Sequence, residues 1–151
     1  IKMKSRLNYN EVAPGALRAM MGLEKYVHQS DLESSLVELV KMRASQLNEC
    51  AYCIDMHSKD ARKAGETEQR LYALSAWRET PFFSERERAA LEWTEALTKL
   101  SSTHITDELY DSVKKHFSDE EMVVFTMSII AINGWNRLGV GFRSEVGTYQ
   151  P

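Results

Sequence analysis

Two cysteines, Cys50 and Cys53, are the residues of this chain with the clearest capacity for redox chemistry. They form a Cys-x-x-Cys pair, a spacing that two randomly placed cysteines would reach roughly once in seventy-five trials. A disulfide closing so short a loop would stabilise the fold by only about 2 kcal/mol, and a chain of 151 residues can bury a core without it. The pair therefore indicates thiol chemistry rather than a structural cross-link.

A histidine, His57, follows Cys53 by one helical turn. On a helix, Cys50, Cys53 and His57 share one face with the small residues Ala61 and Ala64, so we expect this face to point inward. A thiolate attacks peroxides and disulfides, and a helix N-terminus lowers the pKa of a thiol. His57 can accept the thiol proton, and a second thiol can resolve an oxidised sulfur by closing a disulfide. The pattern offers a nucleophile, a resolving thiol and a base.

Two other interpretations of these three residues stay open. Cysteine is often a small buried hydrophobic residue, and a single inward-facing histidine is often a satisfied core residue. Cys50, Cys53, His57 and one carboxylate would also suffice for a zinc site. A structural zinc site commonly uses a second Cys or His pair, however, and the other histidines occur singly. We therefore expect no metal and no cofactor.

The elements that must position these residues are predicted to be helices, in an all-α fold. Proline and glycine are sparse, at 3 and 7 residues, and no stretch alternates apolar and polar residues for long enough to predict a strand. Capping boxes or cap residues indicate helix starts at Ser30, Thr67, Ser84, Thr106 and Ser118. Gly65 and Pro81 are suited to helix ends.

We predict about seven helices in one domain that comprises residues 1–151. Segment 1–14 is expected to be an extended arm, and segment 139–151 a tail that contains glycine. The predicted helices span residues 15–29, 31–48, 51–64, 68–79, 85–100, 107–116 and 119–138.

Charge and hydropathy exclude several classes of protein. The chain has 19 basic and 22 acidic residues without a basic run, so we expect no binding of nucleic acid or of an anionic membrane. The most apolar stretch, Met122 to Ile132, is much shorter than the ~20 residues of a bilayer span. The N-terminal segment contains no apolar signal core. These features predict a soluble cytoplasmic protein.

A longer pattern includes a glutamate. Eleven residues separate Glu38 from Cys50, two separate Cys50 from Cys53, and three separate Cys53 from His57. This spacing resembles the motif of the AhpD-like alkylhydroperoxidases, in the carboxymuconolactone decarboxylase superfamily. The resemblance continues through residues 63–65, 86–91 and 131–137, and thus covers most of the chain. It implies a small all-α protein that assembles into a homo-oligomer, a trimer or a hexamer.

The resemblance also implies roles for these residues in the reduction of alkyl or organic hydroperoxides. Cys53 would be the peroxidatic thiol, Cys50 its proton donor and resolving partner, and His57 and Glu38 the proton relay. A dithiol reductant, such as a lipoyl-protein or a thioredoxin-like protein, would reduce the disulfide again. Tyr52 stands where several AhpD proteins have a histidine. Because a phenol is a poor base near neutral pH, we expect a relay of Glu38 and His57 only.

The helical wheel alone gives Glu38 a different place. On the predicted helix 31–48 the apolar arc spans about 220°, and Glu38 falls about 40° outside it. The wheel therefore favours a surface glutamate, and only the resemblance assigns Glu38 to the relay. The same broad arc, together with the apolar run 122–132, predicts surfaces that are covered in an oligomer.

Other functions remain as alternatives to the peroxidase. The redox pair would also serve a thiol–disulfide oxidoreductase or a redox sensor that acts on a protein partner. A carboxymuconolactone-type decarboxylase is disfavoured because that chemistry does not require a vicinal thiol pair. Asn133, Trp135 and Asn136 are candidates for the pocket wall or for satisfied core residues.

Overall fold

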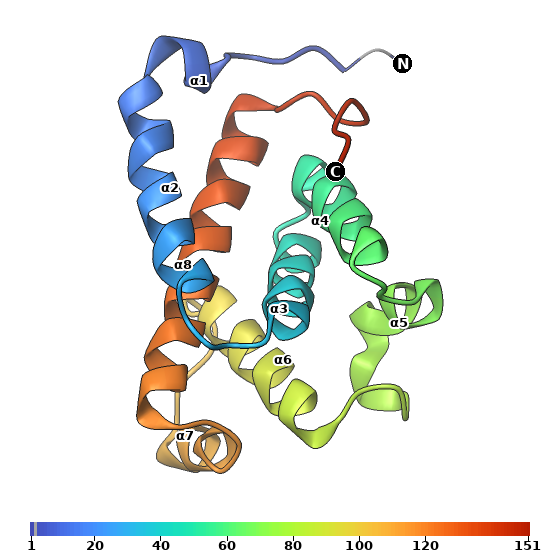
Figure 1. Ribbon diagram of the computed structural model, residues 1–151, viewed down its shortest axis with the longest axis vertical. Helices are drawn as coiled ribbons and strands as arrows, with labels where there is room; N and C mark the ends of the chain where they lie inside the picture. The colour runs from blue at the N-terminus through green and yellow to red at the C-terminus, as the bar shows by residue number, and fades with distance from the viewer. Residues whose placement is uncertain (2) are drawn as a thin grey trace.

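The structure is a computed structural model that describes residue 1 and residues 3–151, and the described residues form helices without strands. The predicted all-α fold class is confirmed. Figure 1 shows the arrangement of the helices. In chain order they are α1 (Tyr9–Val12), α2 (Pro14–His28), α3 (Ser34–Leu47), α4 (Ala51–Lys63), α5 (Glu68–Ala73), the 3-10 helix η1 (Leu74–Glu79), α6 (Glu85–Thr98), α7 (Asp107–Lys114) and α8 (Asp119–Phe142).

Helix α3 lies in the middle of the fold and packs against α4, α6 and α8 (Figure 1). Leu39, Val40 and Ala44 on this helix are at most 1% exposed. Even Lys41 and Ser45 are buried. The wide apolar arc predicted for this helix is thus used within one chain, because neighbours cover it on more than one side.

Several predicted helix starts and one predicted end are confirmed. Ser84 and Ser118 form complete capping boxes, in which each serine and the glutamate three residues later exchange side-chain to backbone hydrogen bonds. The Thr67 and Thr106 side chains cap α5 and α7. Gly65 follows the end of α4 with φ 98°, a conformation that glycine adopts without strain.

The predicted start at Ser30 is wrong. Helix α3 begins at Ser34, and its N-cap residue Glu33 makes no side-chain capping bond. The Ser30 hydroxyl instead donates to the Val27 carbonyl at 2.6 Å and accepts from the Leu32 N–H at 3.3 Å. Ser30 therefore closes the end of α2 and forms the following turn, a competing use of the same short polar side chain.

The predicted helix 68–79 is divided. Residues 68–73 form α5, and residues 74–79 form the 3-10 helix η1, with Ala76 in a non-helical conformation (φ −119°, ψ 31°). Arg88 of α6 donates to the Trp77 and Thr80 carbonyls, each at 3.1 Å. These carbonyls thus find their partner on another helix, which the local sequence could not indicate.

Both ends of the chain contain more helix than predicted. The arm includes the short helix α1, whose N-cap Asn8 accepts from the Asn10 N–H at 3.2 Å. Helix α8 continues to Phe142, and Arg143 ends it in the left-handed conformation with φ 54°. The Arg6 N–H donates to the Phe142 carbonyl at 2.9 Å, so the arm lies across the C-terminal end of α8.

Helix α8 has the length and composition of a membrane-spanning helix. In the fold it packs against α2, α3, α4 and α6, and Phe125, Ala131 and Ile132 are fully buried. Its position in the protein core therefore explains the apolar residues on its buried faces, while Val123, Ile130 and Val140 stay exposed.

Candidate functional site

The turn between α3 and α4 places Cys50 at the start of α4. Cys50 is the N-cap residue, and its Sγ accepts from the Cys53 N–H at 3.4 Å. Cys50 and Cys53 form a disulfide, and they are only 1% and 2% exposed. The predicted position of the pair in or beside the first helical turn is confirmed, and there the helix dipole and free N–H groups favour a thiolate.

The predicted inward face of α4 is confirmed in part, because Ala64, which was also expected on this face, is exposed. Cys53, His57 and Ala61 are the buried residues of this helix. His57 is 5% exposed, and its Nδ1 lies 3.1 Å from Oε2 of Glu38. Because a carboxylate only accepts, this contact favours the tautomer with the proton on Nδ1.

The other ring nitrogen of His57, Nε2, is buried and has no hydrogen-bond partner among the residues that the structure describes. In that tautomer Nε2 carries the free lone pair of the imidazole. A buried polar atom without a partner is costly and needs an explanation. Its lone pair is suited to accept a proton from a thiol or from a bound substrate.

Glu38 is less exposed than the surface position that the helical wheel favours. Its side chain is 21% exposed, so it is neither a free surface group nor a core residue. It reaches from α3 to His57 on α4, and these two helices pack against each other. The structure thus brings Glu38, His57 and the cysteine-bearing helix together.

A cavity of about 440 Å³ lies beside this pair of residues. Its volume is within the range of small-molecule sites, roughly 300–1,000 Å³. Glu38 and His57 form part of its wall, together with charged groups of α2, α3 and α4. Most of the remaining wall is apolar or aromatic, from Tyr9, Leu17, Met21, Tyr52, Met56 and Trp135.

Sequence reasoning missed the ion pair of Glu24 and Lys41 in the wall of this cavity. The Lys41 Nζ lies 2.6 Å from Oε2 of Glu24, and Trp135 Nε1 donates to Oε1 of Glu24 at 2.9 Å. Lys41 follows Glu38 by three residues on α3, which would have placed both on one face. Nothing local could have paired Lys41 with Glu24, which is on another helix.

Asn133, Trp135 and Asn136 of α8 were candidates for the pocket wall or for satisfied core residues, and they differ in which of these roles they take. Trp135 lines the cavity, whereas Asn133 and Asn136 belong to a side-chain network with Asn48. Asn136 is 1% exposed, and its Nδ2 donates to the Ser45 hydroxyl at 3.0 Å. The two asparagines are thus satisfied polar residues, of which Asn136 is buried and Asn133 is half-buried.

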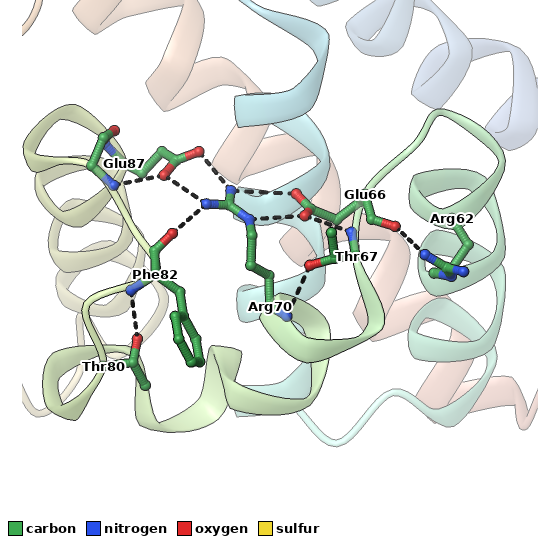
Figure 2. Close-up of polar contacts among 8 residues, drawn as sticks. Arg62, Glu66, Thr67, Arg70, Thr80, Phe82 and Glu87 are labelled. Carbon is green, nitrogen blue, oxygen red and sulfur yellow. Dashed lines mark hydrogen bonds and ion pairs between the residues drawn. The ribbon is translucent and has the colours of Figure 1, made fainter.

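A second cavity, of about 510 Å³, lies on another side of Glu38 and contains the acidic groups of Asp60, Glu66 and Glu87. Figure 2 shows Arg70 between two of them. Its Nε donates to Glu66 at 2.8 Å and its Nη2 to Glu87 at 2.7 Å. These contacts tie the turn after α4 to the start of α6, so they explain the acidic groups as part of the framework.

Asp60 on α4 binds the C-terminal tail. Its Oδ1 accepts from the Tyr149 hydroxyl at 2.7 Å, and this hydrogen bond raises the pKa of Tyr149 to about 12. The Lys59 Nζ donates to the Tyr149 carbonyl at 3.0 Å. The tail therefore lies along α4, close to the cavity wall that Asp60 shares with His57.

Metal ligands do not gather at this site. In the part of the chain that the structure describes, no group of three or more His, Cys, Asp or Glu side chains is arranged to hold a metal ion. The chemistry that the geometry does support is that of a buried thiol pair with a positioned imidazole.

Comparison with known proteins identifies the family. The model of the carboxymuconolactone decarboxylase family matches residues 14–96. The uncharacterized protein YdfG of Bacillus subtilis is 48% identical over 146 residues, which cover 97% of this chain and 99% of YdfG. The uncharacterized protein YnjA of Escherichia coli is 30% identical over 78% of this chain and 62% of its own length.

Solved structures share the fold. A protein of unknown function from Agrobacterium tumefaciens, provisionally named as the antioxidant defence protein AhpD, is 46% identical over 97% of this chain and 100% of its own, with a TM-score of 0.93. A variant of the debrominase Bmp8, solved with 2,3,4-tribromopyrrole, is 22% identical over 91% of this chain and 74% of its own, with a TM-score of 0.80. This chain therefore belongs to the carboxymuconolactone decarboxylase family, and it is an AhpD-like member of that family.

Proposed function

We propose that the protein is a thiol-dependent peroxidase that reduces alkyl or organic hydroperoxides in antioxidant defence. The observation that carries the proposal is the hydrogen bonding of the His57 ring. Its Nδ1 lies 3.1 Å from Glu38 Oε2, while its buried Nε2 has no hydrogen-bond partner among the described residues. Because Cys53 precedes it by one turn on the same buried face, His57 is suited to take the thiol proton. Glu38 would orient the imidazole and stabilise its charged form.

The proposed cycle has three balanced steps. The Cys53 thiolate attacks the outer oxygen of the hydroperoxide, so the O–O bond breaks and Cys53 becomes a sulfenic acid. The alkoxide takes the proton that His57 removed from the Cys53 thiol and leaves as the alcohol. The Cys50 thiol then attacks this sulfur, and a disulfide forms with the release of water. A dithiol reductant, for which we propose a lipoyl-protein or a thioredoxin-like protein, restores both thiols and is itself oxidised to a disulfide.

The cavity next to His57 supports an organic rather than a purely inorganic peroxide. Its wall contains several large apolar and aromatic side chains, which would contact a hydrocarbon or aryl body. Tyr52 is part of this wall, and its hydroxyl can donate a hydrogen bond but is a poor base near neutral pH.

A thiol–disulfide oxidoreductase or a redox sensor acting on a protein is the second candidate. The exposure of the cysteines, 1% and 2%, weighs against it as the first step of the cycle. A protein thiol could reach these sulfurs only after a local opening of the fold, and this opening would have to be larger than any that a small peroxide requires. The same cost applies to a protein reductant, so we expect the reduction step to include local opening.

We also propose that residues 1–151 form one domain, because α8 packs against α2, α3, α4 and α6. The domain would function in the cytoplasm as a homo-oligomer, a trimer or a hexamer. We expect it to need no cofactor and no metal, and to bind neither nucleic acid nor a membrane.

Thiol counting tests the peroxidase directly. The reduced protein is mixed with one equivalent of cumene hydroperoxide, and free thiols, remaining peroxide and cumyl alcohol are measured. We expect two thiols to be lost for each molecule of alcohol formed, with a Cys50–Cys53 disulfide found by mass spectrometry. Unchanged thiols and unconsumed peroxide would refute the peroxidase. Metal analysis of protein purified without chelator tests the zinc interpretation in parallel.

A further inference from the structure

The turn that joins α3 to α4 decides where Cys50 lies. The Cys50 N–H donates to the Ser45 carbonyl at 3.0 Å, and the Glu49 N–H donates to the Gln46 carbonyl at 3.2 Å. This pair of hydrogen bonds is a Schellman helix end, whose left-handed residue is usually glycine. Here that residue is Glu49, with φ 53°. Because a β-carbon makes this conformation unfavourable, other contacts must hold the turn.

Asn48 supplies such contacts, because it joins the turn to α8. Its Nδ2 donates to Oδ1 of Asn133 and to Oδ1 of Asn136, each at 2.9 Å. Asn136 in turn donates to the hydroxyl of Ser45, at 3.0 Å. One amide network thus connects Ser45, in the last turn of α3, and Asn48, the C-cap residue of α3, to the same face of α8.

Gly139 lies one turn beyond Asn136 on α8 and packs against the sulfurs of Cys50 and Cys53. A β-carbon on Gly139 would lie 2.8 Å from Sγ of Cys50 and 3.6 Å from Sγ of Cys53. The shorter distance is closer than any normal contact of a β-carbon, so the Cys50 sulfur occupies space that only glycine leaves free. Gly141, two residues later on the same helix, has no heavy atom within 4 Å of the corresponding position.

We propose that the face of α8 formed by Asn133, Asn136 and Gly139, together with Asn48, positions the two cysteines for disulfide formation. The amide network holds the turn that precedes Cys50, and Gly139 makes room for its sulfur. These are positioning residues that act through Cys50. The inference rests on the proposed function in one respect, namely that the pair cycles between dithiol and disulfide.

Positioning has a thermodynamic consequence that can be measured without any peroxide. Two thiols held close together form a disulfide more readily, because the fold has already restricted their relative motion. A looser turn or a displaced Cys50 sulfur lowers the equilibrium constant for formation of the disulfide. The exchange with oxidised dithiothreitol measures it, since the protein dithiol is oxidised to the disulfide while dithiothreitol is reduced to its dithiol.

The experiment compares the full chain with Asn48→Ala, Gly139→Ala and Gly141→Ala. Each protein is equilibrated in mixtures of reduced and oxidised dithiothreitol, and the Cys50 and Cys53 thiols are counted by alkylation and mass spectrometry. We expect Asn48→Ala and Gly139→Ala to shift the equilibrium toward the dithiol by about tenfold, which is ~30 mV for a two-electron couple. Gly141→Ala, the matched control, should stay within about twofold of the wild type.

The two test variants are independent, and circular dichroism shows which of them fold. If one fails to fold, Asn48→Asp takes its place, because it keeps the size of the side chain and removes the N–H donors. Folded variants with the wild-type equilibrium, or with one shifted toward the disulfide, would overturn the inference. A wild-type protein that forms no reversible disulfide would instead refute the proposed thiol cycle, so the two failures are distinguishable.

Discussion

Lys41 and Glu24 form an ion pair between α3 and α2, with 2.6 Å between Nζ and Oε2 and with side chains that are 4% and 10% exposed. Burial by itself would raise the pKa of Glu24. The Lys41 ammonium and the Trp135 N–H outweigh this effect, so the pKa lies below its ordinary value of 4.5. The pair therefore joins α2, α3 and α8 beside the cavity that contains His57.

Replacing Lys41 should destabilise the fold, because Lys41→Met leaves the Glu24 carboxylate buried without its cation. We expect a loss of ~3–5 kcal/mol in the free energy of unfolding at neutral pH, measured by urea denaturation. Lys114→Met is the control, since its partner Asp119 is 92% exposed, and it should leave the free energy of unfolding close to that of the wild type. Similar losses for the two variants would contradict the prediction.

The same pair predicts a dependence of stability on pH. Because the pKa of Glu24 is lower in the folded protein than its ordinary value, the pair stabilises the fold fully above pH 4.5. This contribution is lost as the pH falls through the lower, folded-state pKa. The difference in unfolding free energy between the wild type and Lys41→Met should therefore narrow in acid, and a constant difference would argue against the pair as its source.

The two cysteines should differ in their response to peroxide. Cys53→Ser should abolish peroxide turnover, whereas Cys50→Ser should allow one oxidation and no further cycling, because no thiol resolves the sulfenic acid. Mass spectrometry of Cys50→Ser after one equivalent of peroxide should find Cys53 as sulfenic or sulfinic acid. Oxidation of Cys50 in the Cys53→Ser protein, with Cys53 inert in the reciprocal variant, would reverse the two roles.

Removal of the proposed base should slow peroxide reduction in a manner that depends on pH. His57→Gln should lower the rate at neutral pH by roughly 10²–10⁴-fold, with partial recovery at higher pH, where Cys53 ionises without help. Glu38→Gln should show a weaker form of the same profile, and Glu120→Gln, on the exposed surface of α8, should match the wild type. Equal rates for all variants would mean that neither His57 nor Glu38 is in the relay and that the helix N-terminus alone activates the Cys53 thiol.

The tail contact should be visible in a titration of the tyrosines. The Tyr149 pKa is raised from 10.0 to about 12, chiefly by the hydrogen bond to Asp60. Because the folded-state pKa is raised, this bond stabilises the tail fully below pH 10 and is lost as the pH rises through about 12. Tyr149→Phe should remove one tyrosine from the high-pH phase of the ultraviolet absorbance.

The exposed apolar residues of α8 predict self-association. Val123, Ile130 and Val140 are 56%, 49% and 47% exposed, although they are large aliphatic side chains. We expect light scattering at micromolar concentration to give the mass of a trimer or a hexamer, and Ile130→Glu to weaken the assembly. A wild-type mass of 17.3 kDa would show a monomer and contradict the prediction.

Local spacing was sufficient to predict the redox helix. Cys50, Cys53 and His57 share a face because helical geometry repeats about every 3.6 residues, whatever packs against it. The capping boxes at Ser84 and Ser118 also depend on atoms only three residues apart, and both predictions are confirmed. The all-α fold class follows from many such local preferences that agree with one another.

Contacts between distant segments were decided only by the tertiary structure. The helical wheel favoured a surface position for Glu38, and the packing of α3 on α4 instead brings it to His57. At the end of η1, the Trp77 and Thr80 carbonyls accept from Arg88, which belongs to a separate helix. Likewise, the contact of Gly139 with the Cys50 sulfur joins residues far apart in the chain. A local pattern determines which face a residue is on, and only the packed fold determines what that face meets.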